Sequence, residues 1–85
     1  MKIFENIINH KVNHITADEL LKYGKQFNIS VSRSEAEQIA QYLRGKKVNI
    51  FNENERKKLV KEIANIAGVD TAKSVNQIFL MFTNS

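Results

Sequence analysis

The chain has 85 residues, no cysteine and a formal net charge of +4. This length corresponds to one domain, placed at residues 1–85. The lack of cysteine excludes a disulfide framework, thiolate metal sites and thiol catalysis. No apolar run approaches the ~20 residues that span a bilayer, and Glu5, Asn6 and Asn9 interrupt the N-terminal stretch too early for a signal peptide. We therefore expect a cytoplasmic protein.

Two helices are predicted in the first third of the chain. Residues 2–13 place Ile3, Phe4, Ile7, Ile8 and Val12 on one face. Thr16, followed three residues later by Glu19, is a capping box that begins a second helix, which runs to about Phe27. The inner face of this second helix is predicted to be Leu20, Leu21, Gly24 and Phe27, with Tyr23 at the edge. Gly24 inside a helix costs ~1 kcal/mol against Ala, so we expect the small residues Ala36 and Ala40 of the next helix to approach it closely.

The third predicted helix has the clearest pattern. Ser32 is its N-cap, and Glu35 completes the capping box. Its apolar residues recur at the spacing of one helix face, namely Ala36, Ile39, Ala40 and Leu43. Gly45 follows at the position where a left-handed residue ends a helix. Residues 46–51 are then predicted to be extended, with Val48, Ile50 and Phe51 anchoring them to the core.

Two longer helices complete the prediction. The fourth runs from Asn52 to about Ala67, with Glu55 again three residues after the cap, and Gly68 ends it. The fifth runs from Asp70 to about Thr83, and its predicted inner face comprises Ala72, Val75, Ile78, Phe79 and Phe82. The fold class is therefore all-α: a compact orthogonal bundle of about five short helices.

The stretches ITADELLKYGKQFNISVSRSEAEQIAQYLRGKKVNIF and ERKKLVKEIA resemble the YqfT-like proteins of Gram-positive bacteria. The resemblance covers most of the chain and implies one compact helical domain. It brings no activity, ligand or site residue. A weaker, fold-level similarity is to a degenerate EF-hand-like pairing of helices. Neither connection supplies the alternating oxygen ligands of a calcium loop, so we expect no bound calcium.

No catalytic or metal-binding constellation emerges from the sequence. Ser32 and the glutamates at the helix starts are explained by capping. His10 and His14 are four residues apart, but Lys11 stands where a hydrolytic zinc motif needs Glu. The three glycines are scattered and form no phosphate-binding loop. We therefore expect a non-enzymatic protein without cofactor or metal.

The basic residues form two clusters that suggest phosphate contact. Together these candidate nucleic-acid contacts are Arg44, Lys46, Lys47, Arg56, Lys57, Lys58 and Lys61. If the two helix ends pack together, the clusters form one patch whose binding would depend strongly on salt. Against this, glutamates interleave with the second cluster at helical ion-pair spacing, as on an ordinary solvated helix face. A helix-turn-helix is not supported, because Ser34 and Glu37 would fall at buried positions of its second helix.

Residues 78–82 form the apolar run IFLMF, which is wider than one helix face needs. Leu80 and Met81 are thus candidate residues of a protein interface, and the competing hypothesis is that helix 2–13 covers them. We expect a protein–protein interaction or small structural module that binds another protein or a second copy of itself, with no membrane partner. The alternative is a weak, non-specific nucleic-acid-binding domain that uses the basic patch.

Overall fold

Five helices account for most of the chain. The computed structural model describes residues 2–83, and this part of the chain contains no β-strand. The helices are α1 (Lys2–Asn13), α2 (Ala17–Phe27), α3 (Arg33–Leu43), α4 (Glu53–Ala67) and α5 (Val69–Thr83). The predicted all-α bundle is therefore confirmed, with helix bounds close to those expected. Within the described residues, no helix combines the length and the apolar content that crossing a bilayer requires.

Side chains at the helix starts explain why α2 and α3 begin where they do. The Thr16 hydroxyl accepts a hydrogen bond from the Glu19 amide at 3.1 Å, and the Glu19 carboxylate accepts one from the Thr16 amide at 3.0 Å. The latter bond lowers the pKa of Glu19. Ser32 and Glu35 form the same reciprocal pair at 3.1 and 2.9 Å. Both predicted capping boxes are confirmed.

The predicted third capping box is half formed. The Asn52 side chain accepts from the Glu55 amide at 3.0 Å and so caps α4. The Glu55 carboxylate, however, accepts from the Asn49 amide at 3.0 Å, whereas the Asn52 amide donates to the Asn49 carbonyl. Glu55 therefore binds the Asn49 amide in the turn before α4 and leaves the Asn52 amide to the Asn49 carbonyl.

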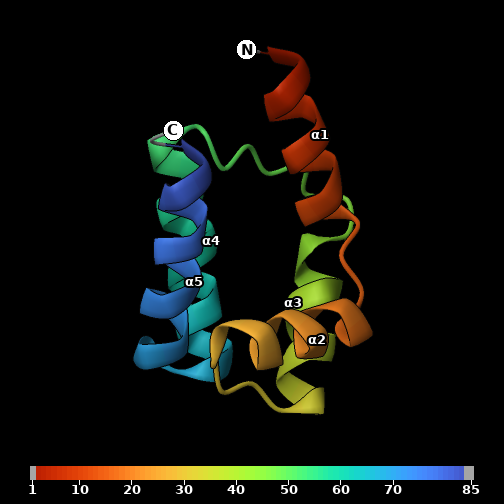
Figure 1. Ribbon diagram of the computed structural model, residues 1–85, viewed down its shortest axis with the longest axis vertical. Coiled ribbons are helices and arrows are strands. Elements are labelled where there is room, and N and C mark those ends of the chain that lie inside the picture. The colour runs from red at the N-terminus through yellow and green to blue at the C-terminus, as the bar shows by residue number, and fades with distance from the viewer. Residues whose placement is uncertain (1, 84–85) are drawn as a thin grey trace.

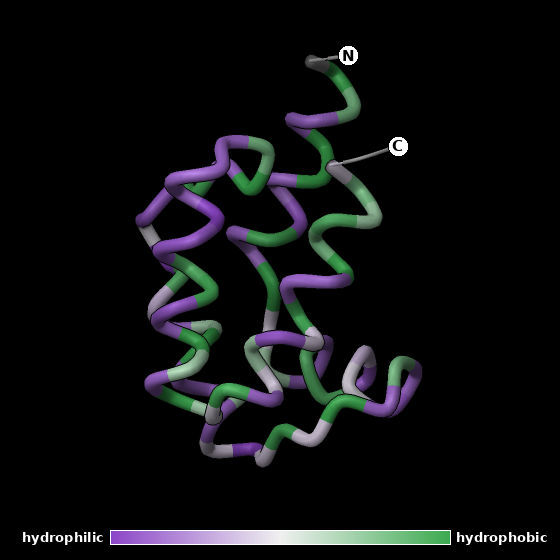
Figure 2. Tube along the Cα trace, turned by 90° about the vertical axis from the view of Figure 1, so that its left-hand side faces the viewer, coloured by the Kyte–Doolittle hydropathy of each residue, from purple (hydrophilic) through white to green (hydrophobic). Residues whose placement is uncertain are grey.

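The helices form two hairpins with α1 added to one of them. α2 packs on α3 and α4 packs on α5, whereas α3 meets α4 over a smaller area. α1 packs on α3 alone among the helices described. Figure 1 shows α4 and α5 on one side of the molecule, with α1 and α3 opposite and α2 below. Hydrophobic and hydrophilic residues alternate along each helix (Figure 2), as amphipathic helices require.

The core lies where α3, α4 and α5 meet. All four residues of the predicted α3 stripe are buried. Ile50 is fully buried between α3 and α4, which confirms that residues 46–51 are anchored to the core. The large side chains at the centre are Ile39, Leu43, Ile50, Leu59 and Ile63. Among the residues described, three of the eight buried hydrophobic residues are alanines, so the fully buried core is small.

Two asparagines of α1 hold the segment between α3 and α4. The Asn13 side chain accepts from the Val48 amide and donates to the Val48 carbonyl, both at 2.8 Å. One turn earlier, the Asn9 side chain accepts from the Ile50 amide at 3.0 Å and donates to the Asn49 side chain at 2.8 Å. These amides replace the partner strand that an extended backbone otherwise needs, because buried backbone groups must be paired.

The close approach predicted at Gly24 is made by a different segment. A Cβ atom on Gly24 would lie 2.9 Å from the Ile29 carbonyl oxygen and 3.2 Å from Val31 Cγ1. These two atoms are its nearest neighbours, in place of the expected Ala36 and Ala40, so this prediction is wrong. The chain reverses at Asn28, whose φ is 56°, and the Ile29 amide donates to the Gly24 carbonyl at 2.7 Å. The connection thus folds back onto its own helix.

We expect Gly24→Ala to destabilise the protein by about 1 kcal/mol or more, although Ala has the higher helix propensity, because the added methyl group meets a backbone oxygen that cannot move freely. The measurement is urea unfolding followed by circular dichroism, with the slope m held in common. Gln26→Ala, at an exposed position of α2, is the matched control and should change stability by less than about 0.5 kcal/mol. A Gly24→Ala variant as stable as the control would contradict the close approach.

We expect Asn13→Ala to cost about 1–3 kcal/mol, because it leaves both polar groups of Val48 without their partner. Asn6→Ala, on the exposed side of the same helix, controls for the change in helix propensity. Hydrogen exchange provides the local measurement: the Val48 amide should lose protection in Asn13→Ala and keep it in Asn6→Ala. Unchanged protection at Val48 would show that this bond does not hold the segment.

Candidate functional site

An apolar cleft separates the two helical hairpins. It has a volume of about 180 Å³ and is lined by seventeen residues drawn from all five helices and from the connections around α2. All of these are apolar except Tyr23, Gly24 and Thr71. An apolar cavity of about 150 Å³ is already large enough to admit a benzene ring. The cleft is therefore large enough to accept apolar side chains from another molecule.

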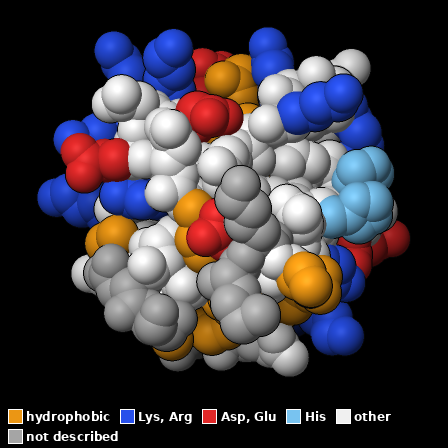
Figure 3. Space-filling view, turned by 90° about the horizontal axis from the view of Figure 1, so that it is seen from above, with side chains coloured by type: hydrophobic (Ala, Val, Ile, Leu, Met, Phe, Trp, Pro, Cys, Tyr) orange, Lys and Arg blue, Asp and Glu red, His pale blue; other side chains and the backbone are white. Residues whose placement is uncertain are grey.

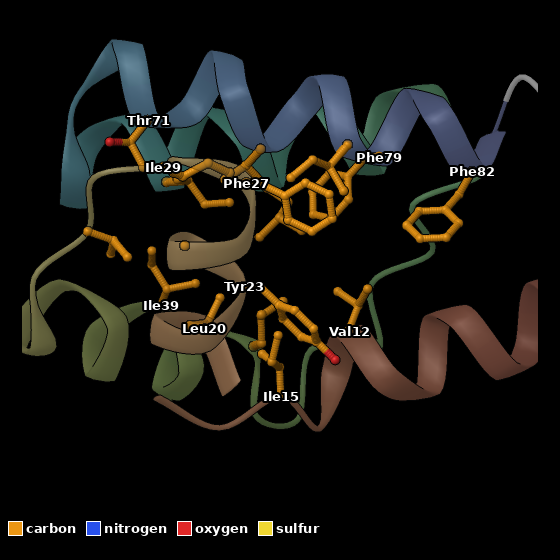
Figure 4. Close-up of a pocket in the computed structure, with 17 residues that line it drawn as sticks. Val12, Ile15, Leu20, Tyr23, Phe27, Ile29, Ile39, Thr71, Phe79 and Phe82 are labelled. Atoms are coloured by element: carbon orange, nitrogen blue, oxygen red, sulfur yellow. The ribbon is translucent and has the colours of Figure 1, made fainter. Parts of the chain in front are cut away.

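Figure 4 shows how the lining side chains are arranged. Phe79 points into the space from α5, while Val12 and Tyr23 face it from α1 and α2. Phe27 comes from the last turn of α2, and Phe82 lies at the end of the cleft where α5 and α1 face each other. The residues at the base, such as Ile39 and Leu43, belong to the buried core. The cleft is thus an opening of the core to the surface.

The cleft offers few polar groups, since the hydroxyls of Tyr23 and Thr71 are the polar side-chain groups of its lining. None of its lining residues is charged. The Thr71 hydroxyl donates to the Ser30 carbonyl at 2.7 Å and so has its partner within the protein. Burial of apolar surface is therefore the interaction this cleft can supply.

Large hydrophobic side chains are exposed in the cleft wall and elsewhere on α1 and α5. Phe27 is 49% exposed and Met81 67%, and α1 contributes Ile3, Phe4 and Ile7 at 45–69%. Seen from above, hydrophobic side chains gather along the lower edge of Figure 3, on both sides of the grey terminal residues. The sequence pattern places Phe27 on the inner face of its helix, and its exposure corrects that prediction. The reason is that no helix covers the last turn of α2 on this side in the part of the chain described.

The structure places the two predicted interface residues differently. Met81 is well exposed, whereas Leu80 is half-buried. The competing hypothesis, that the first helix covers them, is wrong: within the described residues no Cα atom of α1 lies within 8 Å of one in α5. α1 is held on the opposite side of the cleft by its bonds to residues 48–50.

Several of the predicted phosphate-binding residues make contacts within the protein. Arg44 donates to the carbonyls of Asn13 and Ile15 at 3.0 and 2.7 Å, just beyond the end of α1. Arg56 donates to the Ile50 carbonyl at 3.2 Å. In addition, the Lys46 ammonium lies 5.0 Å from the centre of the Tyr42 ring.

The remaining lysines are exposed. Lys57 pairs with Glu53 at 3.2 Å, at the helical spacing predicted from the sequence. Lys47, Lys58 and Lys61 are exposed, and Lys47 lies in the segment after α3 whereas the other two lie on α4. Whether these lysines bind phosphate stays a prediction.

His10 and His14 stack on each other at the end of α1. Their ring centres are 4.1 Å apart, and His14 Nδ1 lies 2.9 Å from the His10 carbonyl oxygen. Among the described residues, no group of three or more His, Cys, Asp or Glu side chains is arranged to hold a metal ion.

Comparisons with known proteins identify a family without identifying an activity. The family described as "Protein of unknown function (DUF2624)" matches residues 1–83. The chain is 49% identical over 84 residues to "Uncharacterized protein YqfT" of Bacillus subtilis (strain 168), covering 99% of this chain and 100% of that relative. No solved structure matches, so the EF-hand-like pairing of helices stays a prediction. The resemblance drawn from the sequence is confirmed.

Sequence reasoning identified one wall of the cleft and missed the cleft itself. The predicted inner face of α5 supplies this wall through Val75, Ile78, Phe79 and Phe82, whereas the candidate interface residue Met81 is exposed and does not line the cleft. The opposing wall comes from Val12, Tyr23 and Phe27, which each fit an ordinary inner-face pattern. One signal was present: Phe27 is the last residue of its helix, directly before a left-handed Asn28, where an inner-face side chain loses its neighbours.

We expect Phe27→Ala to lower the free energy of unfolding by less than half as much as Leu59→Ala, although Phe is the larger side chain. Leu59 is 1% exposed, and removing such a core side chain costs about 2–5 kcal/mol, whereas Phe27 already has about half its surface in water. Denaturant unfolding of both variants decides the point. Equal losses would show that Phe27 is part of the core and not of an open cleft wall.

Proposed function

Since the chain belongs to the DUF2624 family of YqfT-like proteins, whose description assigns no activity, we propose from the structure that it is a protein-interaction module. Its apolar cleft accepts an amphipathic helix, which is a common way for a hydrophobic groove to bind a protein partner. One observation carries the proposal: the cleft opens the hydrophobic core to the surface, and two aromatic side chains of its lining, Phe27 and Phe82, are 49% and 39% exposed. Contiguous apolar surface of this kind marks interaction sites.

The chemistry of the cleft supports a helix over a polar ligand. The lining is uncharged, and its polar side-chain groups are the hydroxyls of Tyr23 and Thr71. Such a cleft gives affinity mainly through apolar burial and offers little orientation to a small polar molecule. An amphipathic helix presents apolar residues at i, i+3, i+4 and i+7, so it can fill the cleft while its polar face stays in water. On this proposal the protein works without catalysis or cofactor, and we place it in the cytoplasm.

Nucleic-acid binding is the alternative, and the contacts of the arginines weaken it. The guanidinium groups of Arg44 and Arg56 already donate to backbone carbonyls. Lys47, Lys58 and Lys61 remain as exposed lysines, and they lie on two different elements. An electrophoretic shift of generic DNA or RNA at low salt, where phosphate contacts contribute most, is the result that would favour the alternative.

The test uses a synthetic 16-residue peptide of Leu, Ala and Glu that forms an amphipathic helix with Leu at the four anchor positions. Acidic residues on its polar face suit a protein of net charge +4. We expect the methyl NMR signals of Val12, Val75 and Ile78, which line the cleft, to shift on titration. The Val69 methyls, exposed beyond the cleft, should not shift. A peptide of the same composition with scrambled leucines is the ligand control.

Variants at the rim test the same point from the protein side. We expect Phe27→Ser to weaken peptide binding at least about tenfold, since Phe27 is an exposed aromatic of the cleft wall. Val69→Ser, at another exposed apolar position, is the matched control and should bind as the wild type does. Cleft methyls that stay unshifted by millimolar peptide, or equal shifts with the scrambled peptide, would overturn the proposal.

A further inference from the structure

We infer that the helix received by the cleft is α1 of a second copy of this chain, so that two copies exchange α1 contacts across a two-fold axis. The inference rests on the proposed function and names the partner. The same molecule supplies both halves of the contact: an open apolar cleft, and a helix whose outer apolar side chains are uncovered.

The first two turns of α1 have the required form. Asn9 and Asn13 fix the later turns to residues 48–50, and Ile8 and Val12 pack against the core. Ile3 and Ile7 are four residues apart and therefore share one face of the helix, and they are 69% and 58% exposed. Figure 1 shows this part of α1 rising above the rest of its side of the molecule. It can therefore reach another molecule without unfolding.

A two-fold arrangement makes the contact mutual. α1 forms one wall at the open end of the cleft and α5 forms the other, with their Cα atoms more than 8 Å apart throughout the described residues. When two such ends face each other, the outer side chains Ile3 and Ile7 of each copy can enter the apolar cleft of its partner, while the rest of α1 lies across the opening. This is an isologous contact, in which the same surface of both copies is buried and no further copy can be added.

The exposed apolar area fits a dimer. The large exposed side chains of α1, of the last turn of α2 and of the end of α5 are Ile3, Phe4, Ile7, Phe27, Met81 and Phe82, at 39–69% exposure. At roughly 200 Å² for a fully exposed side chain of this size, they offer about 650 Å² per copy. A stable, specific interface buries about 800 Å² per partner. The standard range is about 600–1,000 Å² per partner, and the estimate falls near its lower end.

Charge does not oppose the contact. Residues 74–83 of α5 contain no ionisable side chain, so the wall that receives α1 is neutral. Between Ile3 and Ile7 the α1 segment carries a single charge, at Glu5. Two copies of a protein of net charge +4 therefore approach through a surface without a run of like charges, whose juxtaposition disfavours association.

The first measurement is sedimentation equilibrium on the full chain from about 1 μM to about 1 mM, the range in which a modest interface dissociates. We expect the mass to rise from 9.8 kDa toward twice that value. Ile7→Asp in α1 and Phe27→Asp in the cleft wall should each raise the dissociation constant at least about tenfold. Gln41→Asp and Val69→Asp, at exposed positions outside the contact, are the controls and should dimerise as the wild type does.

Mixing the two weakened variants tests the exchange itself. The intact α1 of Phe27→Asp can enter the intact cleft of Ile7→Asp, so the mixture retains one of the two contacts. We expect it to associate more strongly than either variant alone. Association no stronger than that of the separate variants would overturn the exchange of α1.

The chain has no cysteine, so any disulfide formed by an engineered pair of cysteines comes from that pair alone. A disulfide needs Cα atoms within about 7 Å, and α1 and α5 of one copy are farther apart than that. Under mild oxidation, the double variant Ile7→Cys with Met81→Cys should therefore give covalent dimers. Gln41→Cys with Met81→Cys, using an exposed position of α3, should give few.

The outcomes separate this inference from the proposed function. A mass of 9.8 kDa at about 1 mM, with the synthetic peptide still bound in the cleft, overturns the second copy as partner and leaves the interaction module standing. A monomer that also fails to bind the peptide overturns both. A dimer that is unaffected by Ile7→Asp, and whose Ile7→Cys with Met81→Cys variant forms no disulfide between copies, uses another surface and likewise overturns the inference.

Discussion

The arrangement of the molecule depends on the hydrogen bonds between two asparagine side chains of α1 and the backbone of residues 48–50. An extended segment in the middle of a helical bundle has amide and carbonyl groups without neighbours, and these must be paired when they are taken from water. Asn9 and Asn13 pair them from one helix. As a result, residues 47–49, which lie between the turn after α3 and the turn before α4, are held in place without a partner strand.

This extended segment determines the distance between the two hairpins. A short turn after α3 would bring α4 back against it along its whole length and close the core. Here α3 and α4 meet over a limited area, with Ile50 filling the contact. The same asparagines hold α1 on the side of α3, away from α5. The cleft is thus open because the hydrogen bonds of Asn9 and Asn13 hold α1 and residues 48–50 away from α5. Its apolar lining is the part of the core that no described helix covers.

The sequence was sufficient to predict what depends on neighbours along the chain. Thr16 with Glu19 and Ser32 with Glu35 are three residues apart, and their hydrogen bonds form within one helical turn. Helix bounds and the buried stripe of α3 followed for the same reason. At the start of α4 the pattern correctly predicted the Asn52 cap. It wrongly predicted a reciprocal bond from Glu55 to the Asn52 amide, because Glu55 binds the Asn49 amide of the preceding turn.

What the sequence could not predict depends on contacts between distant residues. Asn9 and Asn13 look like ordinary polar positions of an amphipathic helix, and their partners are 35–41 residues away. The close neighbour of Gly24 is the connection that folds back through the left-handed Asn28, whereas the helical pattern pointed to the next helix. Phe27 is exposed because no helix within the described residues covers it. This depends on how the two hairpins are assembled, which the spacing of residues along one helix does not reveal.

The small core links the cleft to stability. Among the described residues the buried hydrophobic set contains five large side chains and three alanines, in a chain of which 42% is hydrophobic. A domain of this size buries only about 60% of its unfolded surface, so apolar area left open at the cleft is a sizeable part of what could stabilise it. A molecule that binds in the cleft of the folded form alone raises the free energy of unfolding. At concentrations well above its Kd, this increase grows with the logarithm of the ratio of concentration to Kd. If that molecule is a second copy, the folded state and the binding surface support each other, because each copy completes the core that the other leaves open.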